Sequence, residues 1–277
     1  MSTQLAITAY GNPHRLERIF EAFDLVGWPQ TDVFVIEDLS TDAIHDGYRD
    51  VCSKRGVPLY RMDEWGCMNG SAQTAFETAT AEWVIYYPDD VLPTPGAIDS
   101  VVQWCNVFDL PEHEAWRVGA FQIPYWNFEK WAGGLYEKHR DECFGSRDLR
   151  WLMGVPYNPH WYGPAYYVNV NGAGFAARKS AWLAAGGFSR KTWCLDEHLS
   201  CKLWLATDYS IVTVPGPPIV HAGGLSTPDQ HREGHTHLRI ATDAGWLDEW
   251  QESKSSLGEK CRMRMRVEQK RTGLIAR

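Results

Sequence analysis

The sequence predicts an α/β fold in which helices flank a mostly parallel central sheet. Short apolar runs alternate with segments of helical periodicity along the first part of the chain, as in βαβ units. The length of 277 residues, with 44% hydrophobic and 22% charged residues, allows a large buried core. Neither an internal repeat nor a low-complexity linker interrupts the chain. These observations favour one domain with a C-terminal extension.

The first half of the chain predicts four strands joined by helices. Thr41 or Asp42 is suited to cap the helix after the second strand, because either side chain can accept from a free backbone N–H group. Right-handed crossovers between parallel strands would place Tyr10, Asp38 and Asp89 at one edge of the sheet. The predicted strands are 5–10, 32–36, 57–60 and 84–87, and the predicted helices are 15–26, 41–55 and 69–80.

The second half predicts a different organisation. Residues 124–164 are rich in aromatic side chains, are interrupted by Pro and Gly, and lack a clear period, which is typical of a loop layer over a site. A short helix at 178–185 ends at the Gly186-Gly187 pair. A later helix at 195–205 carries Asp196 and Glu197 near its start. Further strands are predicted at 117–123, 166–170, 172–175 and 210–214, and a last apolar run ends at His221.

Composition and charge argue against several classes of protein. The net charge of -8 gives no support for a surface that coats nucleic acid. No apolar run reaches the length of a membrane span, and the first residues do not resemble a signal peptide. The seven cysteines are an odd number without Cys-x-x-Cys spacing, which argues against structural zinc and against a disulfide framework. We therefore expect a reducing, cytoplasmic compartment.

Two adjacent carboxylates follow the predicted strand at 84–87. Asp89 and Asp90 repel each other when both are ionised, and a bound cation would relieve that repulsion. Mg²⁺ is commonly held by one or two carboxylates together with substrate phosphates. A solvated turn in which Asp accepts local backbone N–H groups is the alternative interpretation.

The order of motifs along the chain resembles family 2-type glycosyltransferases of the GT-A (Rossmann-like) fold, which move a sugar from a nucleotide sugar to an acceptor. The resemblance spans roughly residues 5–224 and lacks the Gln-x-x-Arg-Trp signature of processive members, which favours transfer of a single sugar. The Asp-x-Asp motif is reduced here to Asp89 and Asp90, and the Glu-Asp pair is replaced by Asp196 and Glu197. The matching segments are 7–10, 35–42, 88–93, 186–188 with 196–200, and 218–221.

The resemblance implies a role for each matching residue. It implies that Thr8, Tyr10 and Asp38 contact the nucleotide, with a UDP-sugar as the favoured donor. It implies that Asp90 and His221 hold Mn²⁺ or Mg²⁺ on the diphosphate, with Asp89 serving the metal or the ribose. It implies that Asp196 or Glu197 is the general base, which predicts inversion at the anomeric carbon, and that Gly66 and Asn69 approach the donor phosphates or sugar. Each residue alone also suits an ordinary turn, cap or strand-end role.

The resemblance also implies a division of the chain. Residues 1–225 would form the glycosyltransferase domain, with a donor half at about 1–115 and an acceptor half at about 116–225. Residues 226–277 would form a lid or extension with a basic tail. His231, His235 and His237 in this extension suit a second metal cluster, or a lid that brings one His to the phosphates.

The acceptor is left open between a glycan, a lipid-linked sugar, a protein side chain and a hydroxymethylated DNA base. A group of aromatic residues can stack on a sugar ring or a nucleobase, although most of them are expected in the core. The tail at 258–277 has seven basic and two acidic residues, which suits an interaction arm, a solvated helix or contact with an anionic surface. The aromatic residues are Trp126, Trp131, Trp151, Trp161, Tyr162, Tyr166 and Tyr167, and further candidate phosphate ligands are Arg140, Arg147 and Arg150.

Two functions from other classes compete with this interpretation. A non-catalytic nucleotide- or glycan-binding protein on the same scaffold would need Asp38 but not Asp90, Glu197 and His221 together. A nucleotidyltransferase would need a Gly-rich phosphate loop and a Lys after the first strand, and residues 11–14 provide neither.

Overall fold

The structure is a computed structural model that describes residues 2–127, 148–155, 163–167, 170–188, 195–222 and 247–274. At 67, 127, 195–198 and 247–258 it describes the backbone alone.

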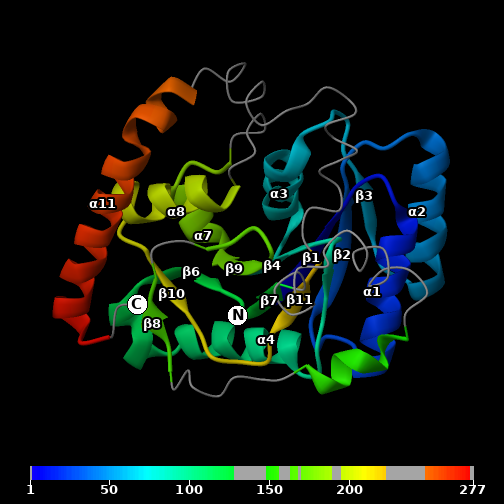
Figure 1. The fold of residues 1–277 in the computed structure, drawn as a ribbon, viewed down its shortest axis with the longest axis horizontal. Helices are drawn as coiled ribbons and strands as arrows, with labels where there is room; N and C mark the ends of the chain where they lie inside the picture. The colour runs from blue at the N-terminus through cyan, green and yellow to red at the C-terminus, as the bar shows by residue number, and fades with distance from the viewer. Residues whose placement is uncertain are drawn as a thin grey trace.

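A mixed sheet forms the centre of the described chain, with the strand order β3-β2-β1-β4-β9-β6-β10-β8 (Figure 1). Strands β1 to β4, β6 and β10 run in one direction, and β8 and β9 run against them. The predicted α/β class with a mostly parallel sheet is therefore confirmed. The strands are β1 Thr3–Ala9, β2 Asp32–Glu37, β3 Leu59–Arg61, β4 Trp83–Pro88, β6 Val118–Gln122, β8 Ala165–Tyr166, β9 Phe175–Arg178 and β10 Ser210–Thr213.

Helices cover both faces of this sheet. Figure 1 shows α3, α7 and α8 on one side of the sheet and α4 on the other. None of the described helices is long and apolar enough to cross a membrane. The α-helices are α1 Pro13–Val26, α2 Asp42–Arg55, α3 Cys67–Thr78, α4 Ala97–Phe108, α7 Lys179–Ala184, α8 Leu195–Ala206 and α11 Leu247–Thr272, and two 3₁₀ helices are η1 Pro111–Trp116 and η2 Leu149–Gly154.

The central strands form where the sequence is apolar at consecutive positions. In β4 the side chains from Trp83 to Tyr87 are all buried, as expected for a strand covered on both faces. Helix α1 begins at Pro13, slightly before the predicted start at 15, because the Asn12 side chain accepts from the His14 N–H at 3.1 Å and Pro13 suits the first helical position.

The strand register brings the predicted site residues to one edge. In the parallel ladder, Ala9 pairs with Glu37 of β2, and Thr8 pairs with Pro88 of β4. The C-terminal ends of β1, β2 and β4 are therefore level, and the residues that follow them emerge together. This placement confirms the predicted edge.

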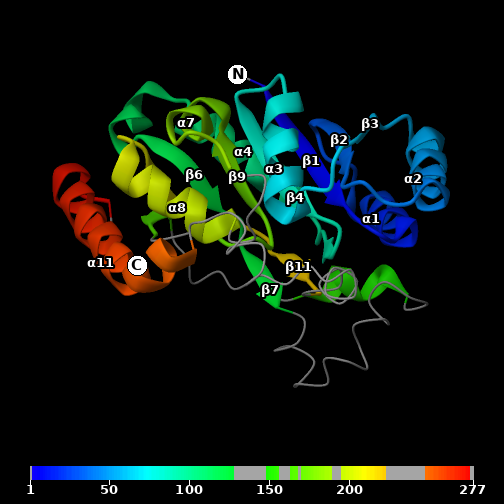
Figure 2. The same cartoon turned by 90° about the horizontal axis from the view of Figure 1, so that it is seen from above.

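A small second sheet lies at that edge and consists of β5 Val91–Leu92, β11 Ile219–His221 and β7 Tyr125–Asn127 (Figure 2). β11 pairs antiparallel with β5, so that His221 lies opposite Val91. The Ala222 N–H donates to the Asp90 carbonyl at 2.8 Å, and the Thr94 hydroxyl donates to the Pro218 carbonyl at 2.5 Å. These contacts fix the late strand against the turn after β4.

Several predicted elements differ from the observed ones. Helix α4 was not predicted, and the third strand lies at 59–61 rather than 57–60. The strand predicted at 172–175 is largely a turn, because Gly174 has φ 151° and its N–H donates to the Asn171 carbonyl at 3.1 Å. The strand β9 begins only at Phe175 and runs antiparallel between β4 and β6.

The basic tail is part of a long helix with one buried face. Helix α11 lies beside α8 in both views and contacts η1 (Figures 1 and 2). Cys261, Met265 and Glu268 on this helix are buried. The tail, predicted as an interaction arm or a solvated helix, is thus a helix with exposed positions and one face that packs against the domain.

Candidate functional site

The centre of the candidate site is an acid–imidazole pair from two distant segments. Asp90 follows β4 and His221 ends β11, and their Oδ2 and Nε2 atoms lie 3.3 Å apart. Burial raises the pKa of Asp90, but the His221 charge and hydrogen bond outweigh it and leave that pKa below the usual range. Burial lowers the pKa of His221, but Asp90 outweighs it and leaves that pKa raised. Both groups thus favour their charged forms.

Asp89 has different surroundings although it is the next residue. Its Oδ2 atom accepts from the Tyr10 N–H at 3.1 Å and lies 3.9 Å from Nη1 of the buried Arg15. Burial raises the pKa of Asp89 to about 7, with the Arg15 charge opposing that rise and the Asp90 charge adding to it. Asp89 therefore links the ends of β1 and β4, while Asp90 faces His221.

The predicted nucleotide-binding residues also lie at this edge. The Thr8 hydroxyl is buried and donates to the Tyr86 hydroxyl at 3.3 Å. Tyr10 directly follows β1 and is 8% exposed. The Asp38 carboxylate accepts from the Gly66 N–H at 2.9 Å, so it connects the end of β2 to the start of α3.

The start of α3 requires close backbone packing. A Cβ atom on Gly66 would lie 2.6 Å from Cε of Met62 and 2.8 Å from Cα of Gly70, so a larger residue would force a shift. Asn69 in the first turn is fully buried. The structure thus places the Gly66 backbone against Asp38, with Asn69 in the first turn of the helix that begins there.

A buried acid next to Asp38 was not among the predicted site residues. Glu37 is fully buried and accepts from the Ser40 N–H at 2.6 Å, with Nδ1 of His45 at 2.9 Å and Nε of Arg61 at 3.5 Å. Leu39, between these acids and Ser40, has φ 24°. The segment 35–42 resembles the Val-Asp-Asp-Gly-Ser-Thr-Asp turn of the family, and Leu39 stands where that turn has Gly. This difference was the signal that could have identified the strained turn.

The predicted general-base residues lie in the first turn of α8, where the structure describes the backbone alone. The N-terminal end of α8 points toward α3 in both views (Figures 1 and 2). The turn at 186–188 follows α7, and its Gly186 and Gly187 have φ 80° and 69°. It is held to α3, because the Phe188 N–H donates to Oε1 of Gln73 at 2.7 Å. The predicted Gly-Gly helix end is confirmed. The positions in the first turn are Asp196 and Glu197.

Tyr125 on β7 is a further residue of the site that was not predicted. Its ring lies edge-on to the His221 ring, with centroids 6.4 Å apart, and it is 38% exposed. The aromatic pair at 125–126 follows the predicted strand at 117–123 after Pro124, and its place near the end of a strand was the signal that could have identified it. Trp126 beside it is half-buried.

Most described aromatic candidates for an acceptor platform belong to the core. Tyr166 is fully buried, shares a hydrogen bond of 3.0 Å with the Thr272 hydroxyl and lies edge-on to Trp204. Trp151 and Tyr167 are half-buried and pack against the core. The exposed Arg150 donates to Asp148 within its own turn. Trp131, Arg140, Arg147, Trp161, Tyr162, His231, His235 and His237 lie outside the described residues.

The donor atoms at Asp90 and His221 suit a hard divalent cation that is shared with a ligand. The described residues contain no cluster of three or more His, Cys, Asp or Glu side chains. Nδ1 of His221 is buried and has no hydrogen-bond partner among the described residues. One carboxylate and one imidazole leave several coordination positions to phosphate oxygens and water, as Mg²⁺ and Mn²⁺ commonly require.

Comparison with known proteins places the fold. No protein-family profile matches the sequence, and no curated protein matches it. The mannosyltransferase PcManGT from Pyrobaculum calidifontis, solved with GDP-Man and Mn²⁺, is similar with a TM-score of 0.55 and 19% identity over 79% of this chain. TarS from S. aureus is similar with a TM-score of 0.54 and 10% identity over 87% of this chain, and with a TM-score of 0.51 in its complex with UDP-GlcNAc.

This chain spans 56% of the length of PcManGT and 68% of that of the TarS structure. At such low sequence identity the likeness concerns the course of the backbone, including the large, mostly parallel sheet and its flanking helices. The chain therefore has the α/β fold of GT-A-type glycosyltransferases.

Proposed function

We propose that this chain is a metal-dependent glycosyltransferase that moves a single hexosyl or pentosyl group from a nucleotide-diphosphate sugar to an acceptor hydroxyl. The observation that carries this proposal is the contact between Asp90 and His221, which joins residues far apart in sequence at the C-terminal edge of the sheet. Open α/β sheets bind their ligands at this edge. The GDP-Man and Mn²⁺ in PcManGT and the UDP-GlcNAc in TarS support a nucleotide-sugar donor.

Asp90 and His221 would hold Mn²⁺ or Mg²⁺ against the donor diphosphate. The cation would act as a Lewis acid that offsets the negative charge developing on the leaving nucleotide diphosphate. Asp89 would keep the ends of β1 and β4 in place through Tyr10, and its carboxylate would also bind the ribose.

The nucleotide would lie over the ends of β1 and β2. The Tyr10 ring would stack on the base, Asp38 would accept from a base N–H, and Thr8 would line the base and ribose pocket. Asn69 at the start of α3 would approach the phosphates or the sugar. We favour UDP as the nucleotide.

Glu197 or Asp196 would remove the proton from the acceptor hydroxyl as it attacks the anomeric carbon. A single base and one direct displacement predict inversion of configuration. Residues 1–225 would form the catalytic domain and 226–277 a lid and extension, with the acceptor being a glycan, a protein or a hydroxymethylated DNA base.

The test is turnover of a panel of UDP-, GDP- and TDP-sugars with Mn²⁺, measured as release of the nucleoside diphosphate. We expect one donor to be consumed, and we expect Asp90→Asn to lose metal-dependent donor binding. Glu197→Gln should bind donor normally and lose transfer. Donor binding without turnover would indicate the non-catalytic alternative, and pyrophosphate exchange would indicate a nucleotidyltransferase.

A further inference from the structure

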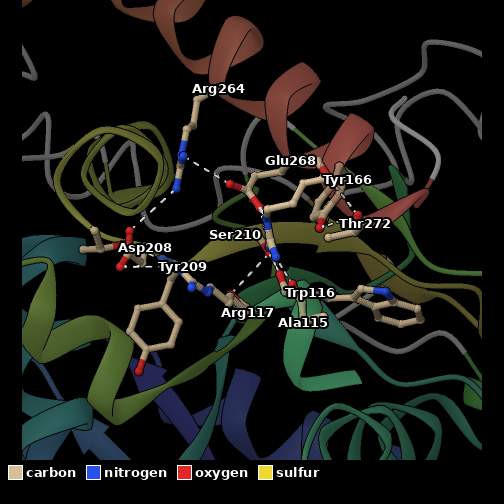
Figure 3. A network of polar contacts seen from close by, with 12 residues as sticks. Ala115, Trp116, Arg117, Tyr166, Asp208, Tyr209, Ser210, Arg264, Glu268 and Thr272 are labelled. Carbon is tan, nitrogen blue, oxygen red and sulfur yellow. Dashed lines mark hydrogen bonds and ion pairs between the residues drawn. The ribbon is translucent and has the colours of Figure 1, made fainter. Parts of the chain in front are cut away.

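The basic residues of α11 fall into two groups with different surroundings. Arg264 and Arg271 pair with the buried Glu268 at 3.1 Å and 2.6 Å. Arg271 also donates to the Ala115 carbonyl at 2.5 Å, and Arg264 lies 3.8 Å from Asp208 (Figure 3). This network holds the helix against η1 and the segment before β10.

The second group lies on the outer face of α11, which we define as Lys260, Arg262, Met263, Arg266, Val267 and Lys270. All six residues are exposed, with Met263 at 53% and Val267 at 55%. The four cations form no ion pair or hydrogen bond with the part of the chain that the structure describes. Positions 263, 266, 267 and 270 recur at spacings of three and four residues, so they share one side of the helix.

We propose that the outer face of α11 binds the surface of an anionic lipid bilayer. A helix lies in a membrane interface when apolar side chains on one face can enter the headgroup region while basic side chains beside them meet anionic lipids. Met263 and Val267 are large apolar side chains that stay more than half exposed in the described chain. Their position between cations matches that arrangement, and it is local because the whole chain carries a net charge of -8.

A nucleic acid is the less favoured partner of this face. Phosphate backbones would attract the four cations, but they offer no apolar layer for Met263 and Val267. Proteins that bind single strands also use aromatic side chains for stacking, and the outer face contains none. The proposal does not depend on the glycosyltransferase activity, because it uses no residue of the candidate site.

The test is co-sedimentation of the full chain with vesicles of phosphatidylcholine alone or mixed with an equal amount of phosphatidylglycerol. We expect binding to the mixed vesicles that weakens as NaCl is raised. The double variant Arg266→Gln/Lys270→Gln should bind the mixed vesicles about 25-fold more weakly, because each charge removed should weaken binding about fivefold. Met263→Ser/Val267→Ser should weaken binding as well, since it removes the inserted apolar groups.

The matched control is Arg49→Gln/Lys54→Gln, which removes the same charge from exposed positions of α2 and should bind like the unmodified chain. Circular dichroism and thermal unfolding check that each variant is folded, and Lys260→Gln/Arg262→Gln serves as a second pair. Equal binding to neutral vesicles, or unchanged binding of both charge variants, would overturn the proposal. The proposal would also be overturned if duplex DNA displaced the vesicles and still bound the Met263→Ser/Val267→Ser variant.

Discussion

Neighbouring carboxylates in this chain have different roles because they face different partners. Asp90 has an imidazole at 3.3 Å. Asp89 instead accepts from a backbone N–H at 3.1 Å and has a buried guanidinium at 3.9 Å. The sequence predicts the pair and its place after a strand. The local pattern does not predict which carboxylate faces His221, because that depends on a strand late in the chain, and only the family resemblance assigned this contact to Asp90.

The buried position of Asp89 predicts how stability changes with pH in the metal-free protein. Its pKa of about 7 in the folded chain lies above the usual value near 4, so the folded state binds more protons between these values. Stability should therefore fall as pH rises through about 7. Asp89→Asn removes this titration, so the variant should not lose this stability as pH rises. The free energy of unfolding of the variant minus that of the unmodified chain should therefore rise by at least about 1 kcal/mol between about pH 5.5 and about pH 8.

Urea unfolding of both chains at the two pH values measures this difference. Asp32→Asn, at the exposed start of β2, is the control and should leave the profile unchanged. An Asp89→Asn profile parallel to that of the unmodified chain would show that Asp89 stays ionised throughout.

The turn after β2 predicts a preference for glycine at residue 39. Leu39 has φ 24°, a region that disfavours residues with a Cβ atom, and its side chain is half-buried. Leu39→Ala and Leu39→Gly both lose the side chain, but only Gly relieves the strain. We expect Leu39→Gly to be more stable than Leu39→Ala by about 1 kcal/mol in urea unfolding. If Ala is the more stable of the two, the turn is not strained.

At the scale of elements, the contact between α8 and α11 includes two cysteine thiols. The Sγ atoms of Cys201 and Cys261 lie 4.0 Å apart. A hydrogen bond to Cys201 lowers the pKa of the Cys261 thiol, whereas burial raises that of Cys52 to about 12. The thiol pair lies between the two helices, where Cys261 is buried and Cys201 is half-buried.

Oxidised glutathione should convert this pair to a disulfide. One thiolate of the pair attacks the reagent and releases one glutathione, and the other thiol then displaces the second. The new bond joins α8 to α11 across 60 residues and should stabilise the chain by up to about 4 kcal/mol. Peptide mapping without reductant should find the 201–261 link, and Cys261→Ser should abolish it. Absence of the link in the folded, unmodified chain would show that the helices do not pack as described.

Prediction of elements from sequence succeeded where periodicity and end signals agreed. Helix α1 has an apolar stripe, an Asn cap and a first-turn Pro, and its bounds differ little from those predicted. Helix α4 was missed because it is rich in β-branched residues and begins after Gly96 without a side-chain cap. Its buried residues Ala97, Val101, Cys105 and Phe108 follow helical spacing, so tertiary packing rather than local propensity stabilises it.

At the scale of the whole molecule, the site depends on contacts that no local pattern encodes. His221 meets Asp90 only because β11 pairs with β5, and Tyr125 meets His221 only because β7 pairs with β11. The order of motifs predicted the first meeting through a family resemblance. The second could not be predicted, since it depends on the register of a three-stranded sheet.

A site shared by several segments predicts that metal and donor stabilise the whole fold together. A ligand at about a hundredfold its dissociation constant adds about 2.7 kcal/mol to the free energy of unfolding. For a chain of this size that corresponds to a rise in Tm of about 5–10 °C. We expect this rise with Mn²⁺ and the preferred donor together, and a much smaller one with either alone, because Asp90 and His221 would supply only two ligands to the proposed metal. Differential scanning fluorimetry of the unmodified chain and of His221→Asn measures the effect. An equal rise in Tm for His221→Asn would show that ligand binding does not need His221 of β11. Loss of the rise would show that β4 and β11 bind the same ligand.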